Sequence, residues 1–399
     1  MALTGSNVVK VGSFNQSVIL DAIRRSDGIS RIELAERTSL VPQTVTNICR
    51  RLLADGIIYE AGKTSGSVGK PRTLLRLRGD GRFAVGVLLD PAQITIVLLD
   101  LTGTVEARVH LPTPPPDDPA RVIRTISEQV GSLIAGAGVD PANVLGIGVA
   151  APGPLDLEAG TILNPPYLPG WDRVFLRDDL ASVTGLPVIL EKDVVAAVVA
   201  KTWQGAEAVD ALGVIYVGTG IGVGVSLGGE VIRGASGNAG EIGHIVVDPS
   251  GPRCACGQRG CVAVVSSPTA LVERLGDGAS PTDLLGSFAD LVEAPSDTEH
   301  ARIVDAALDG IARLATVVVD LYDLDHLVFG GPFWEPLRDR FREFSLPRLQ
   351  DAPVARRIHG IRIDDSVLGE DLGAIGAGSL VLDRLLSPRT SSLVFDPTG

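Results

Sequence analysis

The stretch Gly240-Glu241-Ile242-Gly243-His244, followed by Cys254-Ala255-Cys256-Gly257-Gln258-Arg259-Gly260-Cys261, carries the most specific pattern in this 399-residue sequence. It contains a histidine and three of the four cysteines of the chain. One imidazole and three thiolates complete a tetrahedral zinc shell, and cysteines clustered in this way favour metal over disulfides. The alternative is three unrelated buried cysteines. We expect one structural Zn²⁺, bound by His244, Cys254, Cys256 and Cys261.

Upstream of this segment lies a glycine-rich turn between two strand patterns, within Gly213 to Val225. Its centre, Gly218-Thr219-Gly220, would let backbone amides approach a phosphate or a sugar, although a plain tight turn explains the same pattern. Nearer the N-terminus, two buried strand patterns end at Asp90 and begin at Ile94, with Pro91-Ala92-Gln93 between them. Strand patterns alternate with helical ones to the end of the chain, which predicts an α/β body.

The first 80 residues have a different pattern, with three short helices predicted: one at about 15–26, one that opens with Ser30 and has Thr38 near its end, and one at about 42–54. Ser30-Arg31-Ile32-Glu33 has the spacing of a capping box, and Pro42 suits a first helical position. Two strand patterns follow, at 56–60 and 71–77, joined by a loop rich in glycine, serine and lysine. Three helices followed by a hairpin predict a winged helix-turn-helix.

The third of these helices has one apolar face and one polar, basic face. Val45, Ile48 and Leu52 share the spacing of a buried face. The opposite face suits the major groove of DNA, and the loop of the hairpin suits phosphate or the minor groove. The predicted DNA-binding residues are Gln43, Thr44, Thr46, Asn47, Arg50, Arg51, Lys70 and Arg72. A protein-docking module with a solvated polar face is the alternative.

Charge is distributed unevenly along the chain. Residues 1–82 hold 13 basic and 7 acidic side chains, a net +6, whereas the remainder holds 22 basic and 41 acidic ones, a net −19. A basic segment on an acidic body is expected where only one module meets nucleic acid. No apolar run approaches the length of a membrane span and no secretory signal is recognisable, so we expect a cytoplasmic protein without membrane contact.

These motifs, in this order, resemble the ROK family of repressors, open reading frames and kinases. The zinc segment carries most of the resemblance. Further matches are Ala151-Pro152-Gly153-Pro154, Glu191-Lys192-Asp193, Leu327-Val328-Phe329-Gly330-Gly331 and the segment Leu368 to Ala377. The resemblance implies a winged helix-turn-helix followed by a two-lobed actin/hexokinase-like (ribonuclease H-like) α/β domain. The expected division is 1–80 for the winged helix, 81–190 with 368–386 for lobe 1, 191–367 for lobe 2 with its zinc loop, and 387–399 for a tail.

The resemblance also implies a kinase-like sugar site that is altered here. Asp193 matches the catalytic base of the kinases, but the family's preceding Asn is replaced by Lys192, and its Glu after the last cysteine by Ala263. In the first hairpin, Pro91 and Ala92 replace the glycine and threonine that approach ATP. We expect no catalytic residue, with Asp193 as a vestigial base that binds ligand; the alternative for Asp193 is a retained helix N-cap or a surface carboxylate. The expected effector-binding residues are Gly153, Asn164, Lys192, Asp193, Glu241 and His244. Because Lys192 adds a cation and Ala263 removes an anion, we expect an anionic or modified sugar, such as a sugar phosphate or sugar acid. The alternative is that Lys192 points to solvent or pairs with Glu191, which would leave neutral monosaccharides preferred.

The sequence therefore predicts a repressor of carbohydrate genes whose winged helix binds an operator and whose body binds a sugar-like effector. A homodimer or a dimer of dimers would read paired half-sites. An ATP-dependent sugar kinase with a DNA-binding arm is one alternative, favoured by Asp193 and the Gly218-Thr219-Gly220 turn. A scaffold whose winged helix docks protein is the other.

Overall fold

The structure is a computed structural model that describes residues 8–63, 71–115, 117–204, 209–274, 284–293, 299–351, 354 and 358–386. The wing residue Lys70 and the tail at 387–399 lie outside the described residues. Within the described part of the chain, no helix combines the length and the apolar composition that crossing a bilayer would require.

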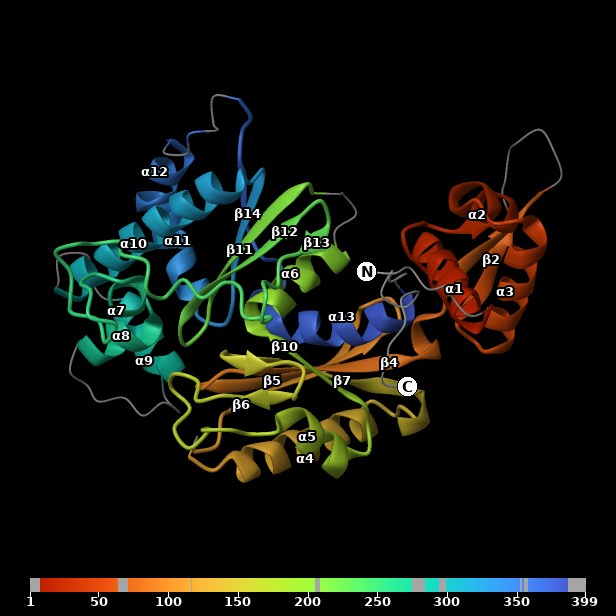
Figure 1. Cartoon of the computed structure of the whole chain (residues 1–399), viewed down its shortest axis with the longest axis horizontal. Coiled ribbons are helices and arrows are strands. Elements are labelled where there is room, and N and C mark those ends of the chain that lie inside the picture. Colours follow the sequence, from red (N-terminus) through yellow and green to blue (C-terminus); the bar gives the residue numbers. More distant parts are fainter. Residues whose placement is uncertain are drawn as a thin grey trace.

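The N-terminal unit consists of three helices and a small antiparallel sheet of order β1-β3-β2 (Figure 1). The capping box predicted before the second helix is present, because Ser30 and Glu33 each accept a hydrogen bond from the other's backbone amide. The first helix begins at Val8, well before the predicted Asn15. The elements are α1 (Val8–Arg24), β1 (Ile29–Ser30), α2 (Arg31–Thr38), α3 (Pro42–Ala54), β2 (Ile58–Lys63) and β3 (Thr73–Leu77).

The core of this unit forms where the sequence pattern placed it. Val45, Ile48 and Leu52 of α3 are buried. Cys49, which the sequence left open as a free thiol or a core residue, is fully buried and belongs to the same core. The predicted winged helix fold is therefore confirmed.

The body contains two five-stranded sheets with the same arrangement of strands. In each sheet a three-stranded antiparallel meander continues into two parallel strands, in the orders β6-β5-β4-β7-β10 and β13-β12-β11-β14-β15. The strands of the first are β4 (Phe83–Leu89), β5 (Gln93–Asp100), β6 (Val105–Pro112), β7 (Val144–Ala151) and β10 (Val188–Lys192). Those of the second are β11 (Ala211–Val217), β12 (Ile221–Leu227), β13 (Glu230–Val231), β14 (His326–Gly330) and β15 (Arg362–Asp365). A separate short ladder joins β8 (Leu155–Asp156) and β9 (Thr161–Ile162).

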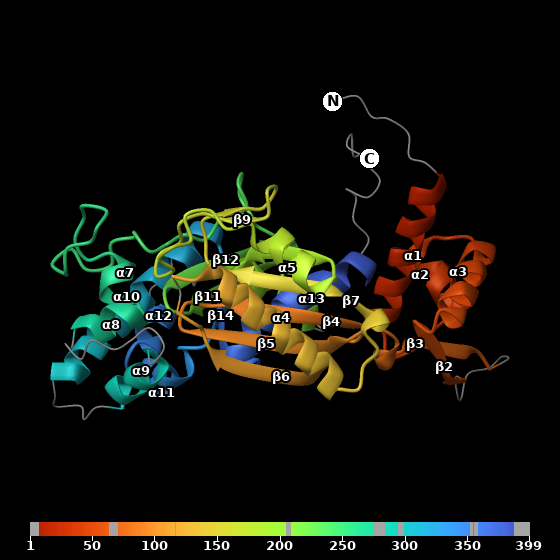
Figure 2. The same ribbon diagram turned by 90° about the horizontal axis from the view of Figure 1, so that it is seen from below.

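Two helices, α6 (Asp193–Gln204) and α13 (Leu372–Leu386), lie between the sheets (Figure 1). Their crossing is close, since a Cβ on Gly376 would lie 1.8 Å from the carbonyl oxygen of Ala196. The outer faces carry the other helices (Figure 2). These are α4 (Pro119–Gly136), α5 (Leu176–Thr184), α7 (Val262–Val265), α8 (Pro268–Arg274), α9 (Leu284–Val292), α10 (Glu299–Tyr322), α11 (Glu335–Phe344) and α12 (Leu346–Asp351). The predicted two-lobed α/β body is confirmed.

The N-terminal unit is joined to the body by a short connection and by side chains. Only residues 78–82, including the 3-10 turn Gly79–Gly81, separate β3 from β4, and the amide of Leu101 donates to the carbonyl of Gly79 at 3.0 Å. Helix α1 packs against α13, where the Ser17 hydroxyl donates to the carbonyl of Leu385. One apolar cluster runs from the N-terminal unit through α6 and α13.

Candidate functional site

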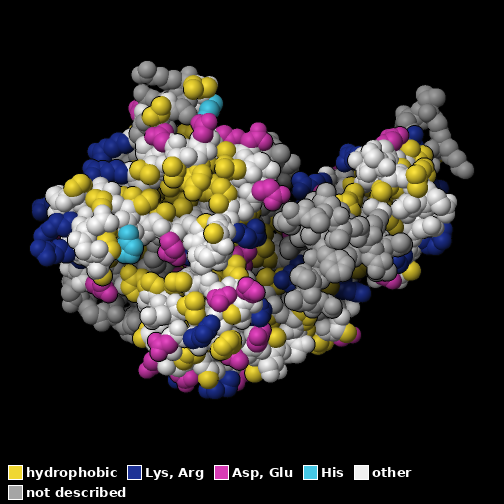
Figure 3. All heavy atoms as spheres, in the orientation of Figure 1, with side chains coloured by type: hydrophobic (Ala, Val, Ile, Leu, Met, Phe, Trp, Pro, Cys, Tyr) yellow, Lys and Arg dark blue, Asp and Glu magenta, His cyan; other side chains and the backbone are white. Residues whose placement is uncertain are grey.

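The outward face of α3 is polar, basic and accessible. The side chains of Gln43, Asn47, Arg50 and Arg51 are exposed, while Thr44 and Thr46 are half-buried beside them. Thr46 donates a hydrogen bond to the Pro42 carbonyl within the helix, and the Gln43 amide donates to the side chain of Asn47. In Figure 3 the unit that carries this face projects from one side of the body.

The wing adds positive charge next to α2. Arg72 is exposed immediately before β3, and Lys63 is exposed at the end of β2. The positive charge of Arg72 helps to lower the pKa of Glu33, which is held mainly by backbone and side-chain hydrogen bonds from Ser30. The strands β2 and β3 pair in the antiparallel sense that a wing requires.

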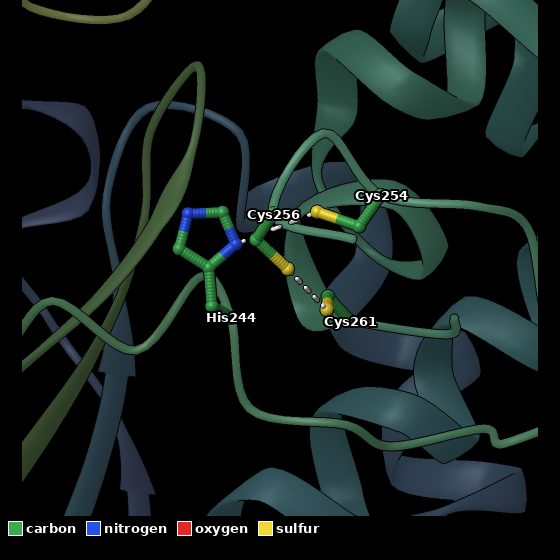
Figure 4. A group of neighbouring side chains, drawn as sticks. All are labelled: His244, Cys254, Cys256 and Cys261. Atoms are coloured by element: carbon green, nitrogen blue, oxygen red, sulfur yellow. Dashed lines mark hydrogen bonds between the residues drawn. The ribbon is translucent and has the colours of Figure 1, made fainter. Parts of the chain in front are cut away.

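The predicted zinc ligands come together in one cluster. One ligand atom from each of His244, Cys254, Cys256 and Cys261 lies within 4.8 Å of all the others. Figure 4 shows the four side chains pointing toward a common centre. The Cys254 sulfur is 3.4 Å from Nδ1 of His244, and the Cys256 and Cys261 sulfurs are 3.6 Å apart.

These separations fit a tetrahedral ion. Zinc–sulfur bonds of about 2.3 Å and zinc–nitrogen bonds of about 2.0 Å place sulfur atoms about 3.8 Å apart and a sulfur about 3.5 Å from a nitrogen. The turn between the ligands needs glycine, because a Cβ on Gly260 would collide with the carbonyl oxygen of Asp248. The cluster can therefore hold a metal ion, with Nδ1 as the histidine donor.

A narrow cavity lies at the junction of the two lobes. Its volume is about 100 Å³, whereas pockets for small molecules usually exceed about 300 Å³. The cavity is therefore smaller than the usual size of a small-molecule pocket. The cavity is lined by Asp90, Pro91, Pro152, Gly153, Pro166, Tyr167, Lys192, Asp193, Val194, Tyr216, Gly218, Thr219, Gly220, Ile221, Gly222, Gly240 and Glu241.

The expected effector residues divide into two groups. Gly153, Lys192, Asp193 and Glu241 line the cavity. Asn164 and His244 do not, and the loop that holds Asn164 contributes Pro166 and Tyr167 to the wall instead. His244 directs Nδ1 into the cysteine cluster, and Ala263 packs beside Gly243 at the zinc loop. Asp90, Tyr216 and Thr219 were not on the predicted effector list, although the glycine turn pointed to Thr219.

Lys192 is buried and forms ion pairs with two carboxylates. Only 4% of its side chain is exposed, and its Nζ lies 2.5 Å from Glu241 and 3.8 Å from Asp193. Burial lowers the pKa of Lys192, but the two carboxylates outweigh burial and the net pKa is raised. The ammonium is therefore charged and already neutralised. The anionic sugar stays a prediction, but the pairing of Lys192 weakens its argument, because an added phosphate or carboxylate would meet Asp193 and Glu241 around a cation that is not free.

Asp193 begins α6 at the floor of the cavity. Burial raises the pKa of its carboxyl to about 6, although the charge of Lys192 and the Val194 amide act in the opposite direction. The amide of Val194 donates to Asp193 at 2.7 Å. A carboxyl at this place can accept a hydrogen bond from a ligand hydroxyl.

Asp90 meets the glycine turn of the opposite lobe. It follows β4 of the first sheet, while Thr219 lies between β11 and β12 of the second sheet. The Asp90 carboxylate accepts hydrogen bonds from the backbone amide and the hydroxyl of Thr219 and from the amide of Ala92. Both of its oxygens are thus occupied from within the chain.

A winged helix joined to a two-lobed body with an interlobe cavity and a Cys₃His cluster defines a class of DNA-binding proteins built on a kinase-like fold. The chain belongs to the ROK family, which it matches over residues 85–384, and residues 16–59 match the winged helix-turn-helix DNA-binding family.

Relatives of two kinds share this body. A glucokinase of Thermotoga maritima is 30% identical over 75% of this chain and 98% of its own length. The NagC transcriptional dual regulator of Escherichia coli is 26% identical over 96% of this chain and 95% of its own length. A solved ROK family transcriptional regulator, a homolog of E. coli MLC, covers 94% of this chain and 98% of its own with a TM-score of 0.70 and 25% identity. Because the matches that include the N-terminal unit are regulators, the comparisons favour a sugar-responsive regulator over a glucokinase.

Proposed function

We propose that this protein is a cytoplasmic transcription repressor of carbohydrate genes that releases or binds its operator in response to a neutral sugar. The observation that carries the proposal is the exposed polar face of α3, presented by a unit that shares an apolar core with the sugar-kinase-like body. The face of α3 would enter the major groove, and Arg72 with Lys63 would meet the phosphate backbone.

A neutral sugar fits the charges of the cleft. Lys192 is paired, while the carboxylates of Asp193 and Glu241 remain available as hydrogen-bond acceptors for hydroxyl groups. The same two acceptors would repel a sugar phosphate. Because the cavity is narrow, a bound sugar would favour a more open arrangement of the lobes, and this difference in affinity between arrangements is what drives a switch.

The route to the DNA-binding unit is α6. This helix begins with Asp193 in the cleft and ends beside Trp203, where Arg24 of α1 donates to the Trp203 carbonyl at 3.2 Å. The Arg24 guanidinium also stacks over the Trp203 ring, with its central carbon 4.2 Å from the ring centroid. A shift of α6 would therefore be felt directly by the winged helix.

Zinc and self-association complete the proposal. The Cys₃His cluster would bind one structural Zn²⁺, with all four positions taken by protein and none left for activated water. A homodimer or a dimer of dimers would place two α3 helices on paired half-sites.

The test is DNA binding on fragments of the source genome, measured by fluorescence anisotropy over a range of salt. We expect affinity to fall steeply with salt, because phosphate contacts release counterions. A panel of neutral pentoses, hexoses and amino sugars should contain one that changes the affinity at least about fivefold, while the matching sugar phosphates should not. Binding that is absent or insensitive to salt would reject the repressor.

A sugar kinase is the second candidate, because the glucokinase relative is 30% identical and the Gly218-Thr219-Gly220 turn is retained. Phosphoryl transfer depends on positioning and neutralising the phosphates, and Pro91 removes a backbone donor from the first hairpin. We expect no sugar-dependent ADP release in a coupled assay. Release that is abolished by Asp193→Asn would establish the kinase.

A further inference from the structure

The carboxylate of Asp90 lies where a glycine-rich turn would present its donors to a phosphate. The amide of Thr219 donates to Oδ2 of Asp90 at 2.9 Å, and the Thr219 hydroxyl donates to Oδ1. The amide of Ala92 completes the set with a donor at 2.9 Å. The amide and the hydroxyl of Thr219 are donors of the kind that glycine-rich turns offer to phosphate oxygens, while the Ala92 amide belongs to the hairpin that carries Asp90.

Among the described residues, no cation contributes to lowering the pKa of this buried carboxyl. Asp90 is 7% exposed, and burial has the largest effect on its carboxyl, whose pKa it raises; hydrogen bonds from Thr219 and Ala92 lower the pKa without outweighing burial. A carboxylate withdrawn from water without a counterion is costly unless hydrogen bonds replace its hydration. The donors from Thr219 and Ala92 supply part of that replacement.

The Asp90 carboxylate fits against the turn because residue 218 is a glycine, which has no side chain. A Cβ on Gly218 would lie 2.9 Å from Oδ2 of Asp90, so a larger residue would push the acid out of the turn. Asp90 and Thr219 are 129 residues apart and belong to different sheets. The contact therefore also fastens the two lobes to each other.

We propose that Asp90 is a built-in substitute for a nucleotide phosphate, which fills the anion-binding turn at Gly218-Thr219-Gly220 and holds the lobes together without nucleotide. A phosphate entering the turn would have to displace this carboxylate, which uses the same donors and repels a second anion. The residue thereby excludes ATP from the cleft. The sensor would then report its sugar independently of the nucleotide pool.

The test compares Asp90→Ala with Asp100→Ala. Asp100 is an apt control, because it is buried to a similar degree and accepts bonds from the Thr102 amide, the Thr102 hydroxyl and the Thr104 amide. Those donors all belong to its own hairpin, so its loss leaves the interlobe contact intact. Amide hydrogen exchange of the full-length protein is followed over residues 217–222, with and without tens of millimolar inorganic phosphate at constant ionic strength.

We expect Asp90→Ala to speed exchange of the Thr219 amide at least about tenfold, since a charge-assisted bond is lost. Phosphate should restore protection at 217–222 in Asp90→Ala and raise its melting temperature by about 3 °C, with no such effect on the wild type. Asp100→Ala should leave this segment unchanged. The proposed repressor function is tested separately, by DNA binding and by the absence of sugar-dependent ADP release in the wild type. This inference about Asp90 can therefore fail without affecting the proposed function.

Two results would overturn the inference. Protection of the wild-type turn by phosphate or ATP would show that the donors are open to an external anion. Unchanged exchange in Asp90→Ala would show that the carboxylate does not occupy them. If Asp90→Ala does not fold, Thr219→Val serves instead, because it removes the hydroxyl donor and keeps the shape of the side chain. Unchanged amide exchange over residues 89–93 in Thr219→Val would also overturn the inference.

Discussion

Asp193 combines burial with charge at the start of α6. With a pKa of about 6, against an ordinary value near 4, its folded form binds a proton more readily than its unfolded form between these values. Stability contributed by this group is therefore present at low pH and lost as pH rises from about 4 to 6. Compared with the wild type, Asp193→Asn should gain about 1–3 kcal/mol of stability between pH 4 and pH 7. Urea unfolding at both pH values checks this, and a pH-independent difference would contradict it.

Residues of the DNA face should differ in what they contribute. Asn47 projects from the middle of α3, where an amide can read a base edge, whereas Arg72 lies on the wing and suits the phosphate backbone. Asn47→Ala should reduce discrimination at one operator position by about 1–3 kcal/mol. Arg72→Ala should weaken binding to all sequences and lower the salt slope by about one. Competition binding with single-base operator variants separates the two, and identical profiles would contradict these roles.

Residue types could be assigned from sequence, but their partners could not. Adjacent charges at Glu191 and Lys192 suggest a local pair. Strand alternation at the end of β10 directs them apart, so that Glu191 pairs with Arg233 and Lys192 pairs with Glu241. Both partners come from a segment about forty or more residues downstream. Such contacts depend on the packing of the lobes, which local patterns do not contain.

Among the structural elements, the zinc loop is the one whose fold depends on a ligand. Cys256→Ser should abolish binding of one zinc per chain and lower the melting temperature by about 5 °C or more, because ligation contributes directly to folding. Cys49→Ala removes the remaining cysteine from the core of the N-terminal unit and should leave the zinc content unchanged. Metal analysis together with thermal unfolding makes the comparison. A stable protein without metal would reject the zinc site.

Helix α6 should carry the sugar signal through Arg24. Arg24→Ala removes the contacts with Trp203 and should reduce the sugar-induced change in DNA affinity about fivefold or more. Arg25→Ala is a matched control, because Arg25 binds the same Asp21 carboxylate but is 66% exposed and has no described contact with Trp203. Anisotropy titrations with and without sugar provide the readout. Equal responses of the two variants would remove α6 from the pathway.

Elements with strong local signals were predicted well, and those fixed by packing were not. The capping box before α2 and Pro42 at the start of α3 set boundaries that the structure confirms. The start of α1 was placed too late, because its first turns carry no comparable signal. Of the residues expected in the cleft, Gly153, Lys192, Asp193 and Glu241 line the cavity, whereas Asn164 and His244 do not. Pro166 and Tyr167, from the loop that holds Asn164, line it instead.

At the scale of the whole molecule, the DNA-binding unit is held firmly in place. The connection at 78–82 is short, and the contacts of α1 with α13 and Trp203 fix its direction. Two such units in a dimer would therefore present α3 helices at a set distance. Inserting about five base pairs, half a helical turn, between operator half-sites should abolish cooperative binding, whereas about ten should restore part of it. Footprinting on spaced operators tests this, and tolerance of every spacing would indicate freely tethered units.

The shared apolar cluster has a consequence for how such proteins can be rebuilt. The inner surface of α1 completes a core that includes Trp203 and Leu386, so the winged helix cannot be exchanged for another without disturbing the body. A chimera that imports a foreign winged helix would leave part of that core exposed unless its first helix carried matching side chains. Operator preference would be exchanged more safely by grafting only the outward residues of α3. By the same reasoning, the outward face of α3 could change freely during evolution, whereas the contact between α1 and the body could not.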